Sequence, residues 1–333
     1  MSGIAEYTFT AVGEHLRLSP STVANSMRNN FCVINPAHFI EIGGVSNLRN
    51  IQISVIYNFC KTICAAIENH RPRPIIICPE DDAVESTAIA CQLCGAYLLL
   101  CECQTVESLF TTFEDTLDEI SSKTADDIST RRNRATQLTR VNIMDSWKAL
   151  DRAQDLRWLG MNHTEGDHDI EMASHYALTY NGGVRILVPG KLVFFPAPKA
   201  LPAHRTWADV VVPGQPTMRR FSATFFAALL PELDVSVVAC MGRTSGSAAA
   251  AFRAGGLDVH DLALDARRPA LLGAMDRLLS ISRAAPGATA LFPGGGAGGG
   301  EAVQEWVGTL ATAVLISDFG FSSETAAAWL RMV

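Results

Sequence analysis

The stretch Leu291-Phe-Pro-Gly-Gly-Gly-Ala-Gly-Gly-Gly-Glu301 decides how the second half of this chain is organised. The apolar run 288–292 predicts a short buried strand, and apolar residues at helical spacing predict a helix over 302–319. A strand, a glycine loop and a helix N-terminus often form an anion site, because loop and helix N–H groups converge there. An equally simple interpretation is a flexible connection that binds no ligand.

The residues that this loop lacks narrow its chemistry. No cysteine occurs after Cys240, and no arginine or lysine occurs between Arg283 and Arg331. The loop also lacks the Gly-Lys-Ser/Thr ending of a nucleotide-binding P-loop, which argues against ATP or GTP. The anion-binding candidates are therefore the backbone groups of six glycines: Gly294, Gly295, Gly296, Gly298, Gly299 and Gly300.

Composition indicates a globular chain long enough for two domains. Of its 333 residues, 48% are hydrophobic and 18% are charged, which disfavours disorder. The net charge of −7 argues against a general affinity for nucleic acid. The first thirty residues lack the apolar segment of a signal peptide, and charge or polarity interrupts every apolar run well short of a membrane span. We expect an intracellular protein without membrane or nucleic-acid partners.

The cysteines invite a zinc interpretation, because Cys91-x-x-Cys94 is followed by Cys101-x-Cys103. The first pair, however, lies in an apolar helical pattern, where a thiol behaves as a small hydrophobic group. The second pair has one intervening residue instead of the usual two to four. We expect neither metal nor cofactor, and predict reduced, mostly buried cysteines at four positions: Cys60, Cys64, Cys91 and Cys94.

Helices and buried strands alternate along the chain, which predicts an α/β layer structure. Strands are expected over 31–35, 75–78, 184–195 (a pair around Pro189-Gly190), 235–240, 259–264 and 288–292. Helices are expected over 48–67, 87–100, 106–120, 141–159, 218–230, 247–255, 269–283 and 302–319, with a last helix capped by Ser322 or Ser323. The predicted divisions are a lead-in (1–30), a first domain (31–160), an acidic linker (161–183) and a second domain (184–333).

Four fragments resemble one family. Ile186-Leu-Val-Pro-Gly-Lys-Leu-Val-Phe-Phe195 is similar to the Ile-Val-Pro-Gly-Lys-Phe segment that opens the catalytic domain of the cell-division-cycle-fourteen phosphatases. Phe31–Asn35 resembles their first-domain Phe-Cys-Tyr-Tyr-Asn, Asn142–Trp147 the helix joining their domains, and Phe321–Arg331 their Phe-x4-Ile-Ile-Ala-Trp-Ile-Arg helix. These are dual-specificity phosphatases of mitotic exit, centrosomes and cilia. The resemblance implies two tandem dual-specificity-phosphatase-like domains, each with a mostly parallel sheet flanked by helices.

The family's chemistry requires a Cys-x5-Arg loop, in which the thiolate attacks phosphorus and the arginine grips phosphate oxygens. An aspartate on another loop protonates the leaving oxygen. Asp265, with Pro269 four residues later, resembles that acid loop and matches the general acid. Aligned from the strand, Pro293 and Gly299 take the cysteine and arginine positions. Aligned backward from Gly308-Thr-Leu310, which resembles the sequence after the family's loop, these positions fall on Gly300 and Trp306.

A second segment, Val237-Val-Ala-Cys-Met-Gly-Arg-Thr-Ser-Gly246, also reads as strand, cysteine, loop and helix. The motif requires arginine six positions after the cysteine, and the residue there is Gly246. Arg243 comes too early to close the same ring around phosphate. We therefore expect Cys240 to be an ordinary strand residue and not a nucleophile.

The expected function is that of a pseudophosphatase, an inactive phosphatase-like protein. As the resemblance implies, it would be a scaffold or structural component of a cytoskeletal or ciliary assembly, with cytoskeletal or axonemal protein partners. One alternative is a phosphoprotein-binding module that uses the glycine loop. Ordering glycines costs roughly 1–2 kcal/mol per residue, so phosphate binding there should be millimolar at best. The other alternative is an active protein phosphatase with an unrecognised nucleophile.

Overall fold

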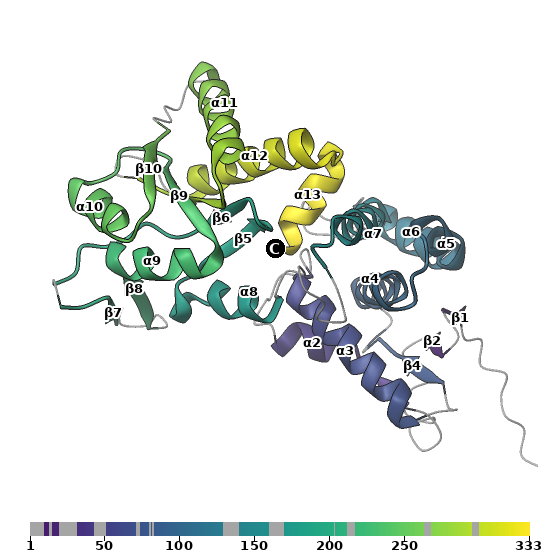
Figure 1. The fold of residues 1–333 in the computed structure, drawn as a ribbon. Coiled ribbons are helices and arrows are strands. Elements are labelled where there is room, and N and C mark those ends of the chain that lie inside the picture. The colour runs from purple at the N-terminus through teal and green to yellow at the C-terminus, as the bar shows by residue number, and fades with distance from the viewer. Residues whose placement is uncertain are drawn as a thin grey trace, which may run out of the picture. The chain divides into compact units, whose positions relative to one another are not determined.

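The computed structural model describes residues 10–12, 15–19, 32–42, 51–70, 74–79, 81, 83–128, 140–159, 170–202, 204–211, 217–262, 268–294 and 300–333. It confirms an α/β architecture, in which helices surround mixed sheets that contain parallel strands (Figure 1). The chain divides into two compact units, Met1–Ile170 and Glu171–Arg331.

The first unit is built on a small mixed sheet in the order β1-β2-β4-β3. Its strands are β1 (Thr10–Ala11), β2 (Leu16–Leu18), β3 (Cys32–Ile34) and β4 (Ile75–Ile77). The buried strand β4 runs parallel to both β2 and β3. The sequence predicted a loosely ordered lead-in over 1–30, and this is wrong for the residues of β1 and β2. Two or three residues are too few for an alternating pattern to stand out.

The helices of this unit are α2 (Ala37–Ile42), α3 (Ile53–His70), α4 (Val84–Cys101), α5 (Val106–Thr112), α6 (Glu114–Ile128) and α7 (Arg140–Asp155). Helix α4 lies against α3, α5, α6 and α7. By length and composition, it is the one helix in the described ranges that could span a membrane, whereas the sequence suggested that all apolar runs are too short. Because 67% of this helix is buried inside the structure, its apolar character is that of a core helix.

The segment 106–139 differs from its predicted secondary structure in two respects. The helix predicted over 106–120 is two helices, because α5 ends at Thr112 and α6 begins at Glu114, with Phe113 between them. The polar segment 121–139, which the sequence pattern leaves as a loop between the predicted helices 106–120 and 141–159, is helical as far as Ile128, the last residue of α6. The arginine-rich segment 131–134 lies outside the described residues.

The second unit contains a five-stranded sheet in the order β10-β9-β11-β6-β5. Its strands are β5 (Arg185–Val188), β6 (Leu192–Phe194), β9 (Val235–Cys240), β10 (Asp258–Asp261) and β11 (Ala288–Phe292). Strand β11 lies in the middle, parallel to β9 and β6, while β5 and β6 form an antiparallel hairpin. The predicted strand pair around Pro189-Gly190 is confirmed, with Gly190 at φ +66° in the turn.

Helices cover both faces of this sheet (Figure 1). On one face, Ala288, Ala290 and Phe292 of β11 share a core with Phe226 and Phe252. Those two rings come from α9 (Ala223–Leu229), which leads into the 3-10 helix η3 (Leu230–Leu233), and from α10 (Gly246–Ala254). The opposite face carries α11 (Arg268–Ala284), α12 (Gly300–Phe319) and α13 (Ser323–Met332). Ser322 caps α13 as predicted.

A separate antiparallel hairpin joins β7 (Trp207–Val210) to β8 (Met218–Phe221). The sequence predicted a helix over 218–230, which is wrong for the residues of β8. The helix begins only after Ser222, whose hydroxyl accepts a hydrogen bond from the Phe225 N–H. The segment expected to be a linker, 161–183, includes α8 (Ile170–Ala177) and the 3-10 helix η2 (Thr179–Asn181).

Candidate functional site

The candidate site lies at the carboxyl end of β11, where α/β sheets usually bind ligands. Pro293 and Gly294 directly follow the strand, and Gly300 is the first residue of α12. Of the predicted site residues, Pro293 and Gly294 therefore lie at the end of the central strand, and Gly300 lies at a helix N-terminus. The remaining glycines (Gly295, Gly296, Gly298 and Gly299) lie outside the described residues, as does the predicted general acid, Asp265.

The chain after β11 packs against the chain after β9. The Met241 N–H donates a hydrogen bond to the Phe292 carbonyl at 3.0 Å. A Cβ atom built on Gly294 would overlap Cys240 Sγ and would lie 2.9 Å from the backbone nitrogen of Arg243. No side chain larger than a hydrogen atom fits at position 294 without a shift. Gly294 therefore has a packing role that the sequence did not reveal.

Asp261, at the end of β10, holds the loop that follows β9. Its Oδ1 accepts hydrogen bonds from the Thr244 N–H at 3.1 Å and from the Thr244 hydroxyl at 2.6 Å. The Leu262 N–H donates to the Cys240 carbonyl at 2.8 Å. This carboxylate thus organises the neighbouring loop. The sequence pattern did not predict this pair, although a polar residue near the end of each of two parallel strands is a signal that could have suggested it.

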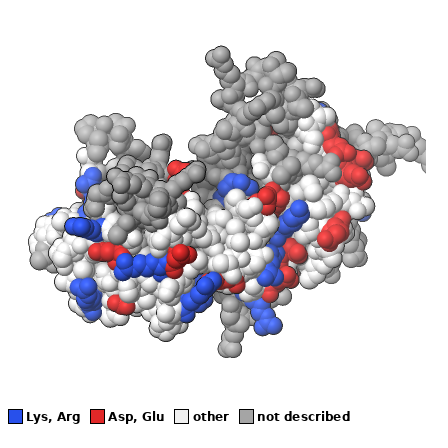
Figure 2. Space-filling model, turned by 90° about the horizontal axis from the view of Figure 1, so that it is seen from above, with Lys and Arg blue, Asp and Glu red and all other residues white. Residues whose placement is uncertain are grey.

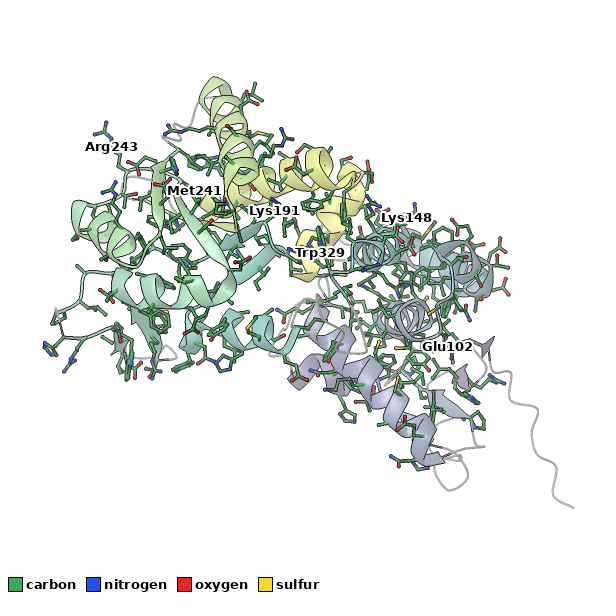
Figure 3. The ribbon with its side chains drawn as sticks, viewed as in Figure 1. Glu102, Lys148, Lys191, Met241, Arg243 and Trp329 are labelled. Carbon is green, nitrogen blue, oxygen red and sulfur yellow. The ribbon has the colours of Figure 1, made fainter. Side chains whose placement is uncertain are left out.

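Cys240 is a buried thiol and not an activated one. The side chain has no exposed surface, and burial is the main reason that its pKa is raised above the ordinary value of 9.0. Arg243 is exposed, and Figure 3 shows its side chain extending away from the sheet. A phosphatase needs a thiolate and a guanidinium side by side. Here the Cys240 thiol is buried and the Arg243 guanidinium lies in solvent.

We predict that Cys240 resists alkylation in the folded protein. Because burial blocks access and the raised pKa depletes the thiolate, iodoacetamide at neutral pH should modify Cys240 at least about tenfold more slowly than the exposed Cys103. Peptide mapping by mass spectrometry measures both rates. In urea the two rates should converge. Equal rates in the folded protein would contradict the buried position of Cys240.

The first unit has a comparable strand end without phosphatase chemistry. Cys78 follows β4, its N–H donates to the Ile34 carbonyl at 3.0 Å, and its side chain is buried. The residue six positions later is Val84 instead of arginine. The intervening sequence contains Glu80, Asp81 and Asp82, which would repel phosphate. The sequence that follows β4 therefore does not resemble a phosphate-binding loop.

The cysteines of the first unit differ in how far they are exposed. Of the four cysteines that were expected to be mostly buried, Cys60, Cys91 and Cys94 are buried and Cys64 is half-buried. Burial raises the pKa of both Cys91 and Cys94. Cys101 is half-buried at the end of α4, and Cys103 is exposed. Within the described ranges, no three His, Cys, Asp or Glu side chains are placed to hold a metal ion.

Comparisons with known proteins identify no family for this chain. It matches no protein-family model, and no curated protein has a significant sequence match to it. The resemblance to phosphatases therefore rests on the four short fragments, and its consequences for this chain are proposals.

Proposed function

We propose that this chain is a pseudophosphatase composed of two tandem dual-specificity-phosphatase-like domains. Its role would be that of a scaffold or structural component in a cytoskeletal or ciliary assembly. The observation that carries the proposal is the path of the chain at β11. The middle strand of the second unit leads into a loop and a helix, as in the resembled family, but its first loop residue is Pro293.

The position of β11 supports one of the two alignments. Pro293 immediately follows the strand, which is where the family's cysteine belongs if the alignment starts from the strand. In the other alignment the reacting positions are Gly300 and Trp306, and both lie in α12. An attacking group must precede the helix so that the helix N-terminus can stabilise its negative charge. The strand-based alignment, with Pro293 and Gly299, is therefore favoured.

Neither residue can perform the missing chemistry. Proline has no nucleophilic side chain, and glycine cannot neutralise the charge that builds on phosphate oxygens. Cys240, on the neighbouring strand, cannot substitute, because Gly294 packs against its sulfur and its pKa is raised. These observations support an inactive site over an active phosphatase with an unrecognised nucleophile.

The proposed partners are proteins. The net charge is −7, and Figure 2 shows acidic and basic side chains interspersed over the face in view. A protein that binds nucleic acid without sequence preference usually gathers its basic residues on one surface. The cytoskeletal or ciliary setting rests on the family resemblance alone.

We predict no hydrolysis of p-nitrophenyl phosphate above a buffer blank at a pH of roughly 5 to 7, where a low-pKa thiolate would work. Because both reacting groups are missing, the Cys240→Ser and Cys78→Ser variants should give the same blank rate as the unmodified chain. Release of nitrophenol is followed by absorbance. Turnover that disappears in either variant would contradict the proposal and identify the nucleophile.

A second measurement separates the scaffold from the phosphate binder. Without an arginine, the loop offers only amide groups and a helix dipole worth about 0.3–1 kcal/mol. Calorimetric titration with tungstate should therefore show at best millimolar affinity, and deleting residues 295–299 should leave the partners captured from native extract unchanged. Micromolar binding of tungstate, or partners lost on deletion, would favour the phosphoprotein-binding alternative.

A further inference from the structure

The β7–β8 hairpin has an open strand edge. The Ser222 N–H donates to the Thr206 carbonyl at 2.8 Å, and Ala208 and Val210 oppose Arg220 and Met218 in the same register. In an antiparallel pair, inward and outward backbone groups alternate, so the N–H and C=O groups of Trp207 and Asp209 point away from β8. No described residue bonds to these groups. Figure 1 shows β7 at the periphery of the second unit.

The opposite edge of the hairpin is occupied. On β8, the Phe221 carbonyl accepts a hydrogen bond from the Lys199 N–H at 2.8 Å. Just before β8, the Thr217 carbonyl accepts one from the Tyr180 hydroxyl at 2.7 Å. An extended chain can therefore pair with the hairpin along β7 but is blocked along β8. Open strand edges of this kind are templates for an added strand.

An aromatic side chain is held in place beside the open edge. Trp207 is 45% exposed, and the Arg219 guanidinium lies 4.0 Å from the centre of its ring. Asp209 holds that guanidinium through hydrogen bonds of 2.8 and 3.2 Å, and the Tyr180 ring lies 5.4 Å from it. Because Trp207 is already ordered, packing a ligand against it costs little side-chain entropy.

The charge of this region differs from that of the chain. Residues 196–222 contain one acidic residue, Asp209, and four basic ones, Lys199, Arg205, Arg219 and Arg220, giving a local charge of +3 in a chain of −7. The Asp209 carboxylate forms an ion pair with Arg219. Across the described ranges, no carboxylate forms an ion pair with the other three basic side chains. The hairpin therefore attracts an acidic segment and repels a second copy of itself.

We propose that β7 binds an acidic, extended segment of a partner protein as an added strand. The backbone groups of Trp207 and Asp209 would pair with that segment, and the exposed indole would pack against one of its apolar side chains. Arg205 and Arg220 would attract its carboxylates. The inference goes beyond the proposed pseudophosphatase role and does not depend on it, because no residue of the hairpin belongs to the β11 loop.

The test uses the full chain and short fluorescent peptides of alternating glutamate and valine, with binding followed by fluorescence anisotropy. We expect the Glu-Val peptide to bind at least about tenfold more tightly than a matched Lys-Val peptide, and more weakly as salt rises. N-methylation of one alternate set of its amides should abolish binding, whereas methylation of the other set should not. Only strand pairing makes alternate amides unequal.

Variants locate the binding surface. Trp207→Thr and the double substitution Arg205→Glu/Arg220→Glu should each weaken binding at least about tenfold, while Arg253→Glu, an exposed change on α10, should not. Thermal unfolding checks that all variants fold. The proposal is overturned if the Lys-Val peptide binds equally well or if both methylated peptides bind. It also fails if oligothymidylate binds more tightly, or if Trp207→Thr dissociates a dimer of this chain.

Discussion

Replacing Trp329 with alanine should lower the free energy of unfolding of the second unit by about 3–5 kcal/mol. The side chain is fully buried on α13, and its Nε1–H donates to the Leu187 carbonyl at 2.8 Å. Leu187 lies where the β5–β6 register shifts, between Ile186 and Val188. A bulge of this kind removes a residue from the strand ladder, so the indole provides the hydrogen bond that β6 does not.

Two variants separate packing from hydrogen bonding. Trp329→Phe keeps much of the buried area but leaves the Leu187 carbonyl unpaired, a loss of about 1–3 kcal/mol. Trp207→Ala is the control, because an exposed tryptophan of the same unit should contribute about 1 kcal/mol or less. Hydrogen exchange of peptides from β9 and β11, followed by mass spectrometry, reports the stability of this unit alone. A Trp329→Ala effect no larger than that of Trp207→Ala would refute the anchoring role.

Replacing Gly95 with alanine should destabilise the first unit by about 1–3 kcal/mol. In most helix interiors this change stabilises, by roughly 0.5–1 kcal/mol. Here a Cβ atom would overlap the Trp147 indole. Trp147 cannot retreat freely, because its Nε1–H donates to the Gln92 carbonyl at 3.2 Å and the Phe113 ring lies 5.4 Å from its own. Overlap with a fixed ring outweighs the gain in helix propensity.

The matched control is Gly273→Ala on α11, where a Cβ atom would meet nothing within 4 Å. This variant should be stabilised by about 0.5–1 kcal/mol, so the two glycines should change stability with opposite signs. Urea unfolding combined with hydrogen exchange of α4 and α11 measures both. Adding Trp147→Phe to Gly95→Ala should recover part of the loss, because the smaller ring makes room. If the double variant instead loses as much stability as the two single variants together, the overlap with Trp147 is not the cause of the Gly95→Ala effect.

Local patterns predicted the elements of the second sheet well. The bounds of β9 and β11 agree with the sequence prediction, because buried parallel strands appear as short apolar runs between turn residues. The amphipathic helix expected over 141–159 corresponds to α7, with Ile143, Trp147 and Leu150 all buried. The tryptophans of two resemblance fragments, Trp147 and Trp329, are both core residues.

The β7–β8 hairpin shows where such patterns fail. Phe221, Phe225 and Leu229 are spaced as on one helix face, so a single helix was predicted across them. In the structure Phe221 pairs with Trp207, fourteen residues earlier, and Ser222 starts the helix instead. A four-residue segment is too short to distinguish the two-residue alternation of a strand from the 3.6-residue spacing of a helix. Pairing with a distant segment decided between them.

What the sequence determined by itself is which side chains the loop after β11 lacks, since folding cannot change the residues that follow the strand. The tertiary structure decided what the remaining residues do. It places Asp261 on Thr244, Gly294 on Cys240 and Trp329 on Leu187. Partners in these pairs are separated by 17 to 142 residues. Only the strand order, with β11 inserted between β9 and β6, brings the loops after β9 and β11 together. No local pattern contains that order, because it depends on which faces bury the most apolar surface together.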